Sequence, residues 1–485
     1  MIKNLTAYRL SAPLVLTAAA AILLSACAII PSESGTQPQR DAAGAQLAAD
    51  IKLAREGWPA ARWWEQYNDP QLSALIDTAL KDGPSVATAA ARVKTAQASL
   101  AGQHANDGLN VGVEAAYDRH YYSANGLFPP PLGGNWITES QLIAKASYDF
   151  DIWGRHRAAI AGAVGEVNAT RADAAQAEQG LAASVAQTYY KLQADWARLD
   201  VLRNQAKLQA SLSELRKKRV DRGLDPITVR ESVQGDQAQL ARQIAAIETQ
   251  AGQDREALRA LIGGDAKALG NLTPRPLPNQ DGALPKELGF ELLARRADLQ
   301  AARWRVEASL SKIESAKAAF YPEINIGGSF GFDTLEAGKL LDWTSHTASL
   351  LPSISLPIFD NGRLSAQLGT QRAKRDEAIA DYNQAIVNAV RDVAQQAVAI
   401  RGLENQIKAQ ADSQKSAQAL QTAAQSRLKI GLVDRSAVIQ AQLAVATQQD
   451  TALQLQQARL DSEIALIKAL GGGYHAPAAT RPAAD

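Results

Sequence analysis

The chain has 485 residues, of which 46% are hydrophobic, 21% are charged and only 5% are aromatic. It carries 51 Lys and Arg residues against 50 Asp and Glu residues, so its net charge is +1. The chain therefore lacks the basic excess that nucleic-acid binding needs, and its apolar fraction excludes a disordered chain. Much of that fraction is Ala, which favours helices but has little volume. The composition therefore favours long, closely packed helices over a thick globular core.

The first thirty residues have the pattern of a bacterial lipoprotein signal peptide. A positive region precedes an apolar run, 10–26, whose last residues Leu-Ser-Ala lead into Cys27, the sole cysteine. This ending resembles the lipobox, at which a peptidase cleaves beside small residues and the cysteine is acylated. An uncleaved membrane helix or an ordinary signal peptide is the alternative, since the run is long enough to span a membrane. We expect 1–26 to be removed and Cys27 to carry a diacylglycerol and an N-acyl chain, with no other cofactor. Ala28, rather than Asp, follows Cys27, which favours the outer membrane.

Two sequence landmarks recur at one spacing. Gly154 and Gly362, each followed by Arg, lie 208 residues apart, and so do Gly223 and Gly431. A shared offset predicts an internal duplication. The expected parts are the signal peptide (1–26), a lipid-anchored N-terminal extension (27–62), a first repeat (63–262), a Pro- and Gly-rich connection (263–286), a second repeat (287–470) and a flexible tail (471–485).

Each repeat contains two segments in which apolar and polar residues alternate. These segments are 109–122 and 141–152 in the first repeat, and 324–332 and 347–358 in the second. Alternation over this length predicts β-strands, and it fits strands that cross a membrane at a tilt. The segments between them, 123–138 and 333–347, are rich in Gly, Pro and polar residues, so we expect loops there.

The remaining sequence predicts helices, two of which are very long. A helix of about 70 residues spans about 105 Å. Gly223 and Gly431 stand where a helix C′ glycine is expected, and Asp225 and Asp434 follow as expected N-caps of helices that return, with Pro226 at the first helical position. The expected long helices are 153–222 and 363–430, the returning helices are 226–262 and 435–470, and the shorter helices before the strands are 71–107 and 287–320.

Four strands are too few to close a membrane barrel, since single-chain barrels begin at eight. An open sheet edge in lipid would leave backbone groups without hydrogen bonds, at a cost of several kcal/mol for each group. The chain is therefore expected to share its strands with copies of itself, and a cyclic arrangement of two, three or four copies would satisfy them.

Seven segments, distributed over nearly the whole mature chain, resemble one protein family. They are WWEQYNDPQLSALIDTAL (63–80), SYDFDIWGRHR (147–157), RRADLQAARWRVEAS (295–309), AAFYPEINIGGSFGF (318–332), LPIFDNGR (356–363), GLVDRSAVIQAQ (431–442) and IKALGGGY (467–474). The sequence is similar to the TolC-like outer-membrane efflux proteins, in the lipoprotein branch that serves RND-type tripartite multidrug pumps.

The resemblance implies a mainly α fold with a membrane β-barrel contribution: a homotrimer whose twelve strands form one barrel and whose helices form a hollow tube through the periplasm. It implies a passive duct, anchored in outer-membrane lipid, that receives substrates from an inner-membrane efflux pump through a periplasmic adaptor (membrane fusion) protein. No nucleic acid is expected as a partner.

The resemblance also points to residues at the periplasmic end of the tube. The turns Gly223-Leu224-Asp225 and Gly431-Leu432-Val433-Asp434 would meet the adaptor, or would only cap helices. Relatives often place an acidic ring where this chain has Gln440, with Ser436 one turn earlier, so a strong cation-binding ring is not expected there. Asp434 would supply some negative charge, and a gate formed by Arg435, Gln440 and Gln442 is a hypothesis.

Three other functions compete with drug efflux. A duct for protein secretion would have a similar sequence. A periplasmic coiled-coil scaffold lipoprotein would explain the helices and Cys27, but not the four alternating segments. An enzyme is the least favoured class, because the five His residues lack metal-ligand spacing and no nucleophile, base and acid motif is present.

Overall fold

The structure, a computed structural model, describes residues 30–475 except 34, 266, 280, 287 and 288. The signal peptide, Cys27 and residues 476–485 lie outside the described residues. The chain forms two compact units, each assembled from three stretches of sequence. Among the described residues, the sheet unit comprises 30–38, 95–168 and 304–380, and the helix unit comprises 39–94, 169–303 and 381–475.

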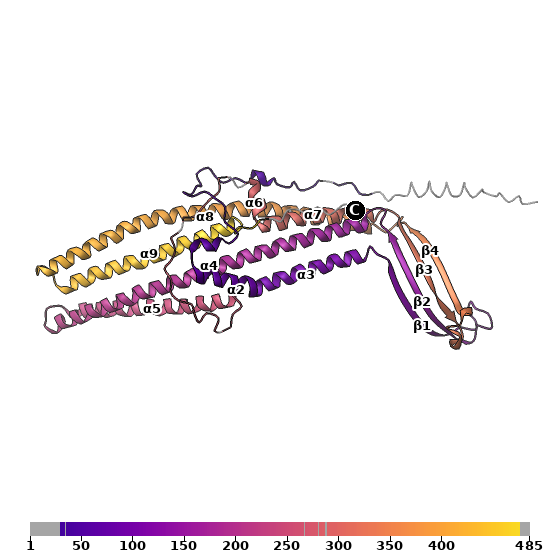
Figure 1. Ribbon diagram of the computed structural model, residues 1–485, viewed down its shortest axis with the longest axis horizontal. Helices are drawn as coiled ribbons and strands as arrows, with labels where there is room; N and C mark the ends of the chain where they lie inside the picture. Colours follow the sequence, from indigo (N-terminus) through magenta and orange to yellow (C-terminus); the bar gives the residue numbers. More distant parts are fainter. Residues whose placement is uncertain (1–29, 34, 266, 280, 287–288, 476–485) are drawn as a thin grey trace, which may run out of the picture. The chain divides into compact units, whose positions relative to one another are not determined.

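The sheet unit contains one antiparallel sheet with the strand order β1-β2-β3-β4 (Figure 1). The strands are β1 (Asn110–Tyr121), β2 (Trp136–Phe150), β3 (Glu323–Thr334) and β4 (His346–Ser355). All four predicted strands are confirmed, but β2 begins inside the predicted loop 123–138. It does so because Trp136 pairs with Tyr121 and their rings lie 5.6 Å apart, which extends the ladder. β4 ends at Ser355, before the predicted 358.

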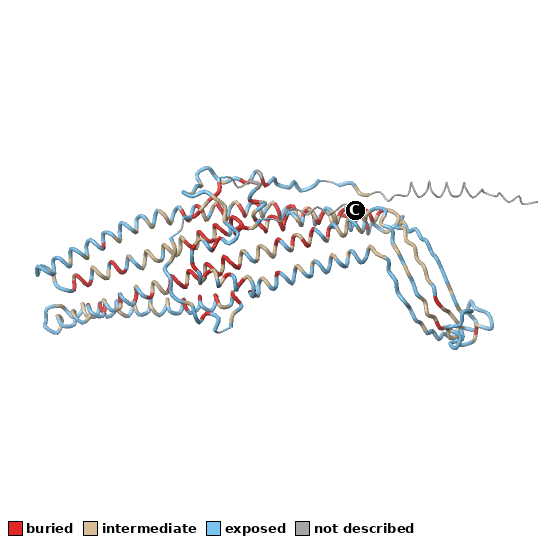
Figure 2. Tube along the Cα trace, viewed as in Figure 1, coloured by how far each residue is buried: buried red, intermediate tan, exposed pale blue. Residues whose placement is uncertain are grey.

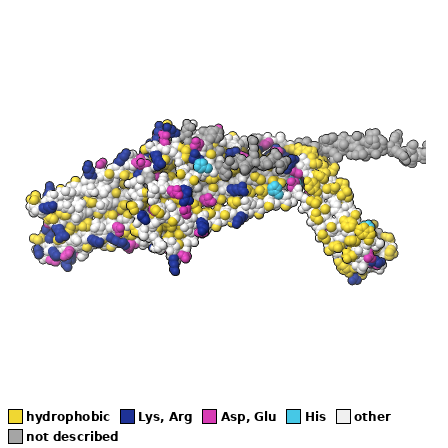
Figure 3. All heavy atoms as spheres, in the orientation of Figure 1, with side chains coloured by type: hydrophobic (Ala, Val, Ile, Leu, Met, Phe, Trp, Pro, Cys, Tyr) yellow, Lys and Arg dark blue, Asp and Glu magenta, His cyan; other side chains and the backbone are white. Residues whose placement is uncertain are grey.

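The register separates an apolar face of the sheet from a polar face. Val113, Ala144, Phe330 and Ala348 are paired across the four strands and share the apolar face, on which Val113 is 72% exposed. The opposite face carries the Lys145–Glu114 ion pair. Figure 3 shows hydrophobic side chains covering the visible side of the strands. The apolar face of this sheet is therefore largely open in a single chain.

Four long helices follow the predicted pattern closely. They are α4 (Arg155–Asp221), α5 (Ile227–Leu261), α8 (Arg363–Lys429) and α9 (Arg435–Ala469). The carboxylate of Asp151 accepts hydrogen bonds from two backbone N–H groups in the first turn of α4, and that of Asp360 accepts one from Leu364 in α8. Both strand-to-helix junctions are thus capped by an aspartate. Among the helices of the described residues, none contains a stretch apolar enough to cross a membrane.

Both shorter helices are interrupted, which corrects the predictions 71–107 and 287–320. The first consists of α2 (Pro70–Asp82) and α3 (Pro84–Ala105), with Gly83 in an extended conformation between them. Pro84 causes this break, because a residue before proline avoids helical geometry and proline lacks an N–H group. The second consists of α6 (Gly289–Arg295) and α7 (Ala297–Ala318). Here the buried Arg296 turns inward and donates to the carbonyl of Ala469 at 2.8 Å, at the end of α9.

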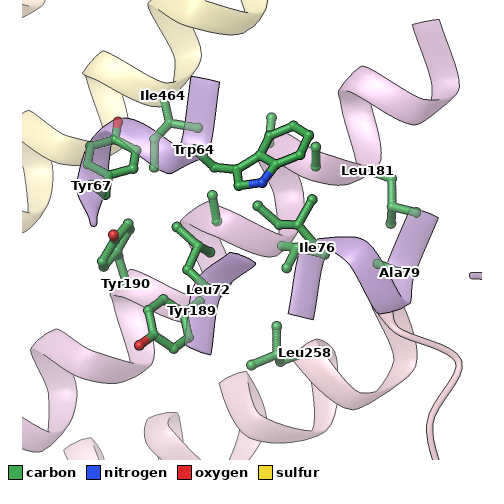
Figure 4. Close-up of a cluster of buried hydrophobic side chains, with 14 of the residues drawn as sticks. Trp64, Tyr67, Leu72, Ile76, Ala79, Leu181, Tyr189, Tyr190, Leu258 and Ile464 are labelled. Carbon is green, nitrogen blue, oxygen red and sulfur yellow. The ribbon is translucent and has the colours of Figure 1, made fainter. Parts of the chain in front are cut away.

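The helix unit is held by a cluster of buried side chains from η2 (Trp63–Tyr67), α2, α4, α5 and α9, some of which Figure 4 shows. Figure 2 shows in red the buried residues along the chain. Tyr189 of α4 donates from its hydroxyl to the Asp69 carboxylate at 2.7 Å. The same carboxylate caps α2 by accepting from the backbone of Gln71 and Leu72. Capping and core packing are therefore coupled through one side chain.

The three glycines after α9 are packed, which corrects the predicted flexible tail at its beginning. Gly471, Gly472 and Gly473 are buried and all have positive φ angles. A Cβ on Gly471 would lie 1.8 Å from the carbonyl oxygen of Arg295, and one on Gly473 would lie 2.0 Å from that of Ala60. Side chains larger than hydrogen do not fit at these positions.

Candidate functional site at the helix tips

Two helix-to-helix turns form the tips of the helix unit, one between α4 and α5 and the other between α8 and α9. At the first tip, the N–H of Gly223 donates to Val220 and that of Leu224 donates to Arg219, both at 2.9 Å. Gly223 has a φ of 70°. This pattern is the Schellman motif, in which a left-handed glycine closes a helix.

The second tip repeats the first. Gly431 has a φ of 74°, and its N–H donates to Leu428 at 3.1 Å, while Leu432 donates to Arg427 at 2.9 Å. The prediction of a C′ glycine is confirmed at both tips. Leu224 and Leu432 are 62% and 70% exposed, so each tip presents a leucine at its surface.

The residues that begin the returning helices differ between the tips. Asp434 is the N-cap of α9, and its carboxylate accepts from the backbone of Ser436 and Ala437 at 3.0 and 3.2 Å. The N-cap of α5 is Pro226, which offers no capping side chain. The predicted N-cap role of Asp225 is therefore wrong. The 208-residue offset between the repeats already indicated this difference, because it aligns the N-cap Asp434 with Pro226 rather than with Asp225.

Asp225 instead forms ion pairs with two arginines in the last turns of α4. Its carboxylate lies 3.2 Å from Arg216 and 2.9 Å from Arg219. The hydrogen bond from Arg219, followed by that from Arg216, lowers the pKa of Asp225. The carboxylate of Asp225 is thus kept ionised and turned back toward α4.

Arg219 also joins the two tips, a role that sequence reasoning missed. Its Nη1 lies 3.3 Å from Oδ2 of Asp434, so one guanidinium contacts an aspartate of each tip. The Ser436 hydroxyl, the backbone N–H groups of Ala437 and Ser436, and the charge of Arg219 together lower the pKa of Asp434. A basic residue in the last turn was visible in the sequence, but its partner 215 residues away was not.

The predicted constriction residues are only partly brought together. Ser436 is buried beneath Asp434, whereas Arg435 and Gln440 are exposed. Within this described segment, no hydrogen bond connects Arg435, Gln440 and Gln442. The hypothesis of a gate among them is therefore not met inside one chain, and it stays a prediction for contacts between copies. In the described part of the chain, no three His, Cys, Asp or Glu residues are arranged to hold a metal ion.

Both repeats carry the sequence of a known family. Residues 75–264 and 288–472 match the family model described as outer membrane efflux protein. The chain belongs to this family. It is 37% identical over 462 residues to the multidrug resistance outer membrane protein MdtP of Escherichia coli (strain K12), a match that covers 94% of this chain and 95% of MdtP.

Solved structures of similar proteins share the architecture. The outer membrane protein VceC from Vibrio cholerae is 29% identical and has a TM-score of 0.75, covering 86% of this chain and all of that chain. The Campylobacter jejuni CmeC outer membrane channel has a TM-score of 0.81 at 18% identity, covering 92% of this chain and 94% of that chain. The second comparison shows the fold alone, and it agrees with the four strands and long helices found here.

Proposed function

We propose that this protein is the outer-membrane channel of a tripartite efflux system. In this role it conducts drugs or other small molecules passively from an inner-membrane pump and a periplasmic adaptor to the exterior. The observation that carries the proposal is the family match over both repeats, together with a relative of nearly equal length that is named for multidrug resistance. The polar and charged side chains at the tips cap helices and form ion pairs, which accords with a passive role.

The sheet supports assembly as a homotrimer. β1 and β4 each pair on one side only among the described strands, and the apolar face of the sheet is open. Three copies would supply twelve strands and pair every edge, with the apolar face toward lipid. The polar face, which carries Glu114 and Lys145, would line the lumen.

The N-terminal extension supports lipid anchoring through Cys27. Ile30 packs against a cluster of Ile313, Phe320, Leu364 and Leu368 in the sheet unit. Arg372 of α8 donates to the carbonyl oxygens of Pro31 and Ser32 at 2.8 and 3.3 Å. Three residues of chain reach about 10 Å at most. Acyl chains on Cys27 would therefore enter the membrane close to the first turns of α8, just after β4.

The tips would receive the adaptor. Leu224 and Leu432 are exposed apolar side chains beside the Arg219, Asp225 and Asp434 charges. An exposed leucine bordered by paired charges suits the end of a helical hairpin, since apolar contact gives affinity and charge gives orientation.

A pair of substitutions on neighbouring residues of β1 tests the channel. Val113→Lys would place a charge on the lipid-facing side, at a cost of about 2–4 kcal/mol per chain, whereas Glu114→Gln changes the lumen-facing side. We expect ion conductance across planar bilayers from the wild type and from Glu114→Gln, but none from Val113→Lys. Conductance by Val113→Lys equal to that of the wild type, or a wild type that passes no ions, would contradict the proposal.

The cargo is tested in a deletion strain. We expect loss of the protein to increase susceptibility to several drugs while the set of secreted proteins is unchanged. If the wild-type gene restores drug resistance to the deletion strain and the Val113→Lys variant does not, the phenotype is connected to the channel. A strain with unchanged drug susceptibility and missing secreted proteins would instead favour the protein-secretion duct.

A further inference from the structure

Two buried aspartates face each other where α4 packs against α5 in the helix unit. Asp195 of α4 is 3% exposed and Asp254 of α5 is 7% exposed. Their side chains lie within hydrogen-bonding reach of each other. The Oδ2 atom of each is buried and receives no hydrogen bond from any described group. Two carboxylates are both acceptors, so this contact is favourable only when one of them carries a proton.

The surrounding charges do not neutralise the pair. Lys191 of α4 lies 3.0 Å from Oδ1 of Asp254, and Gln250 of α5 donates to the same oxygen at 3.0 Å. From α9, Asp461 adds a third carboxyl group within the field of Lys191 and Asp254, and burial raises its pKa to about 6. Three carboxyl groups thus face one ammonium group.

The guanidinium nearest to the pair has another partner. Arg198 of α4 binds both oxygens of Asp450 in α9, at 2.8 and 3.3 Å. The negative charge of Asp450 offsets part of the positive field of Arg198 at Asp195. Burial, and then the charge of Asp254, raise the pKa of Asp195, while Arg198 and Lys191 only partly oppose that rise. The proton between the two aspartates is therefore retained at a higher pH than an exposed carboxyl group would allow.

We propose that Asp195 and Asp254 form a proton-operated latch that fastens α5 to α4. With one shared proton, the two carboxyl groups hydrogen-bond and hold the helices together. When that proton leaves, two negative charges are in contact at a buried position, and the junction loosens. Acidification tightens the latch, and alkaline conditions release it.

The location gives the latch a consequence that rests on the proposed function. α4 and α5 are the two helices that meet at the first tip, where Arg219 and Asp225 lie. Release would free α5 to move against α4, which would make the closure of the duct depend on periplasmic pH. The proton balance is simple: one proton passes to water from a neutral carboxylic acid, which becomes a carboxylate.

Amide hydrogen exchange of the full-length assembled protein tests the latch directly. After correction for intrinsic rates, we expect exchange in α5 near Asp254 to be about tenfold faster at about pH 8.5 than at about pH 5.5, the factor that one pKa unit of coupling produces. Asp195→Asn keeps the shape and gives Asp254 a permanent donor, so the difference between the two pH values should disappear. Asp200→Asn, an exposed change on the same helix, should behave like the wild type.

A second variant and a second measurement keep the test decisive if Asp195→Asn does not fold. Lys191→Met removes the cation beside Asp254, so release should shift to higher pH. Infrared difference spectra between about pH 5.5 and about pH 8.5 should show a carboxylic acid band of the wild type that is lost as the pH rises, and in Lys191→Met this loss should occur at a higher pH. Exchange that is independent of pH in the wild type, or equal in the wild type and Asp195→Asn, would overturn the latch. A wild type that conducts no ions would contradict the proposed function alone, since exchange and infrared spectra need no conductance.

Discussion

Arg219 in the last turn of α4 lies 3.3 Å from Asp434, the residue that caps α9, and it also binds Asp225 of its own tip. One side chain therefore ties together two turns that are far apart in the sequence. In the second repeat, the corresponding residue Arg427 has no ion pair with any residue that the structure describes. The two repeats are thus unequal at the tips, although their backbones turn in the same way.

Arg219→Ala should loosen the tips. Without the guanidinium, Asp225 and Asp434 lose their shared partner, so we expect more frequent or larger openings in single-channel recordings. Arg427→Ala is the matched control, because it removes the counterpart in the other repeat and should leave the recordings unchanged. The reverse pattern, with openings from Arg427→Ala alone, would contradict this role of Arg219.

Asp434→Ala should fray the beginning of α9. Loss of an N-cap costs about 1 kcal/mol, which corresponds to roughly fivefold faster amide exchange at Ser436 and Ala437. Asp434→Asn should retain slow exchange, since Asn is also a good N-cap. Because the pKa of Asp434 is lowered, the part of the helix stabilisation that depends on its negative charge is present above about pH 4 and is lost as the pH falls further. Equal exchange in all three proteins would show that the cap is unimportant.

Glu463→Gln should change how the stability depends on pH. Glu463 of α9 is 3% exposed, and burial raises its pKa to about 7. A raised pKa means that the folded state binds this proton more tightly, so the wild type loses stability between about pH 4.5 and pH 7, by up to about 3 kcal/mol. The variant should melt at a higher temperature than the wild type at about pH 8, with little difference at about pH 5. Glu377→Gln, a change at an exposed position, serves as the control. If Glu463→Gln and Glu377→Gln have the same melting temperatures at both pH values, the prediction is refuted.

Gly165→Ala should destabilise the packing of α4 against α7. A Cβ at Gly165 would lie 2.8 Å from the Cβ of Ala308 and 3.1 Å from its Cα, so the two helices would have to separate. We expect a loss of about 1–3 kcal/mol, measured as a lower melting temperature. Gly180→Ala in the same helix has no atom within 4 Å of the added Cβ and should stabilise by about 0.5–1 kcal/mol. Equal melting temperatures for the two variants would contradict the close approach.

The long helices and the tips could be predicted because their signals are local. Gly223 and Gly431 supply the left-handed residue that the turns require, and the common offset showed that both turns belong to one repeated design. Alternating residues likewise identified all four strands. The interruption at Pro84 also had a local signal, since the residue before a proline avoids helical geometry, but the predicted helix 71–107 ran through it.

Other features depend on contacts between distant residues and have no local signal. The turn at Arg296 occurs because its guanidinium reaches the carbonyl of Ala469. The link from Arg219 to Asp434 and the pair of Asp195 with Asp254 depend on which helices lie side by side. Gly471 resembled the start of a loose tail, and only its packing against the carbonyl of Arg295 shows why glycine is needed.

The central claim is that the four strands of one chain are completed by those of its neighbours. Native mass spectrometry of the full-length protein, extracted from membranes in mild detergent, measures the number of copies directly. The account predicts a complex with the mass of three acylated chains. A stable single chain under the same conditions, with β structure retained, would contradict it.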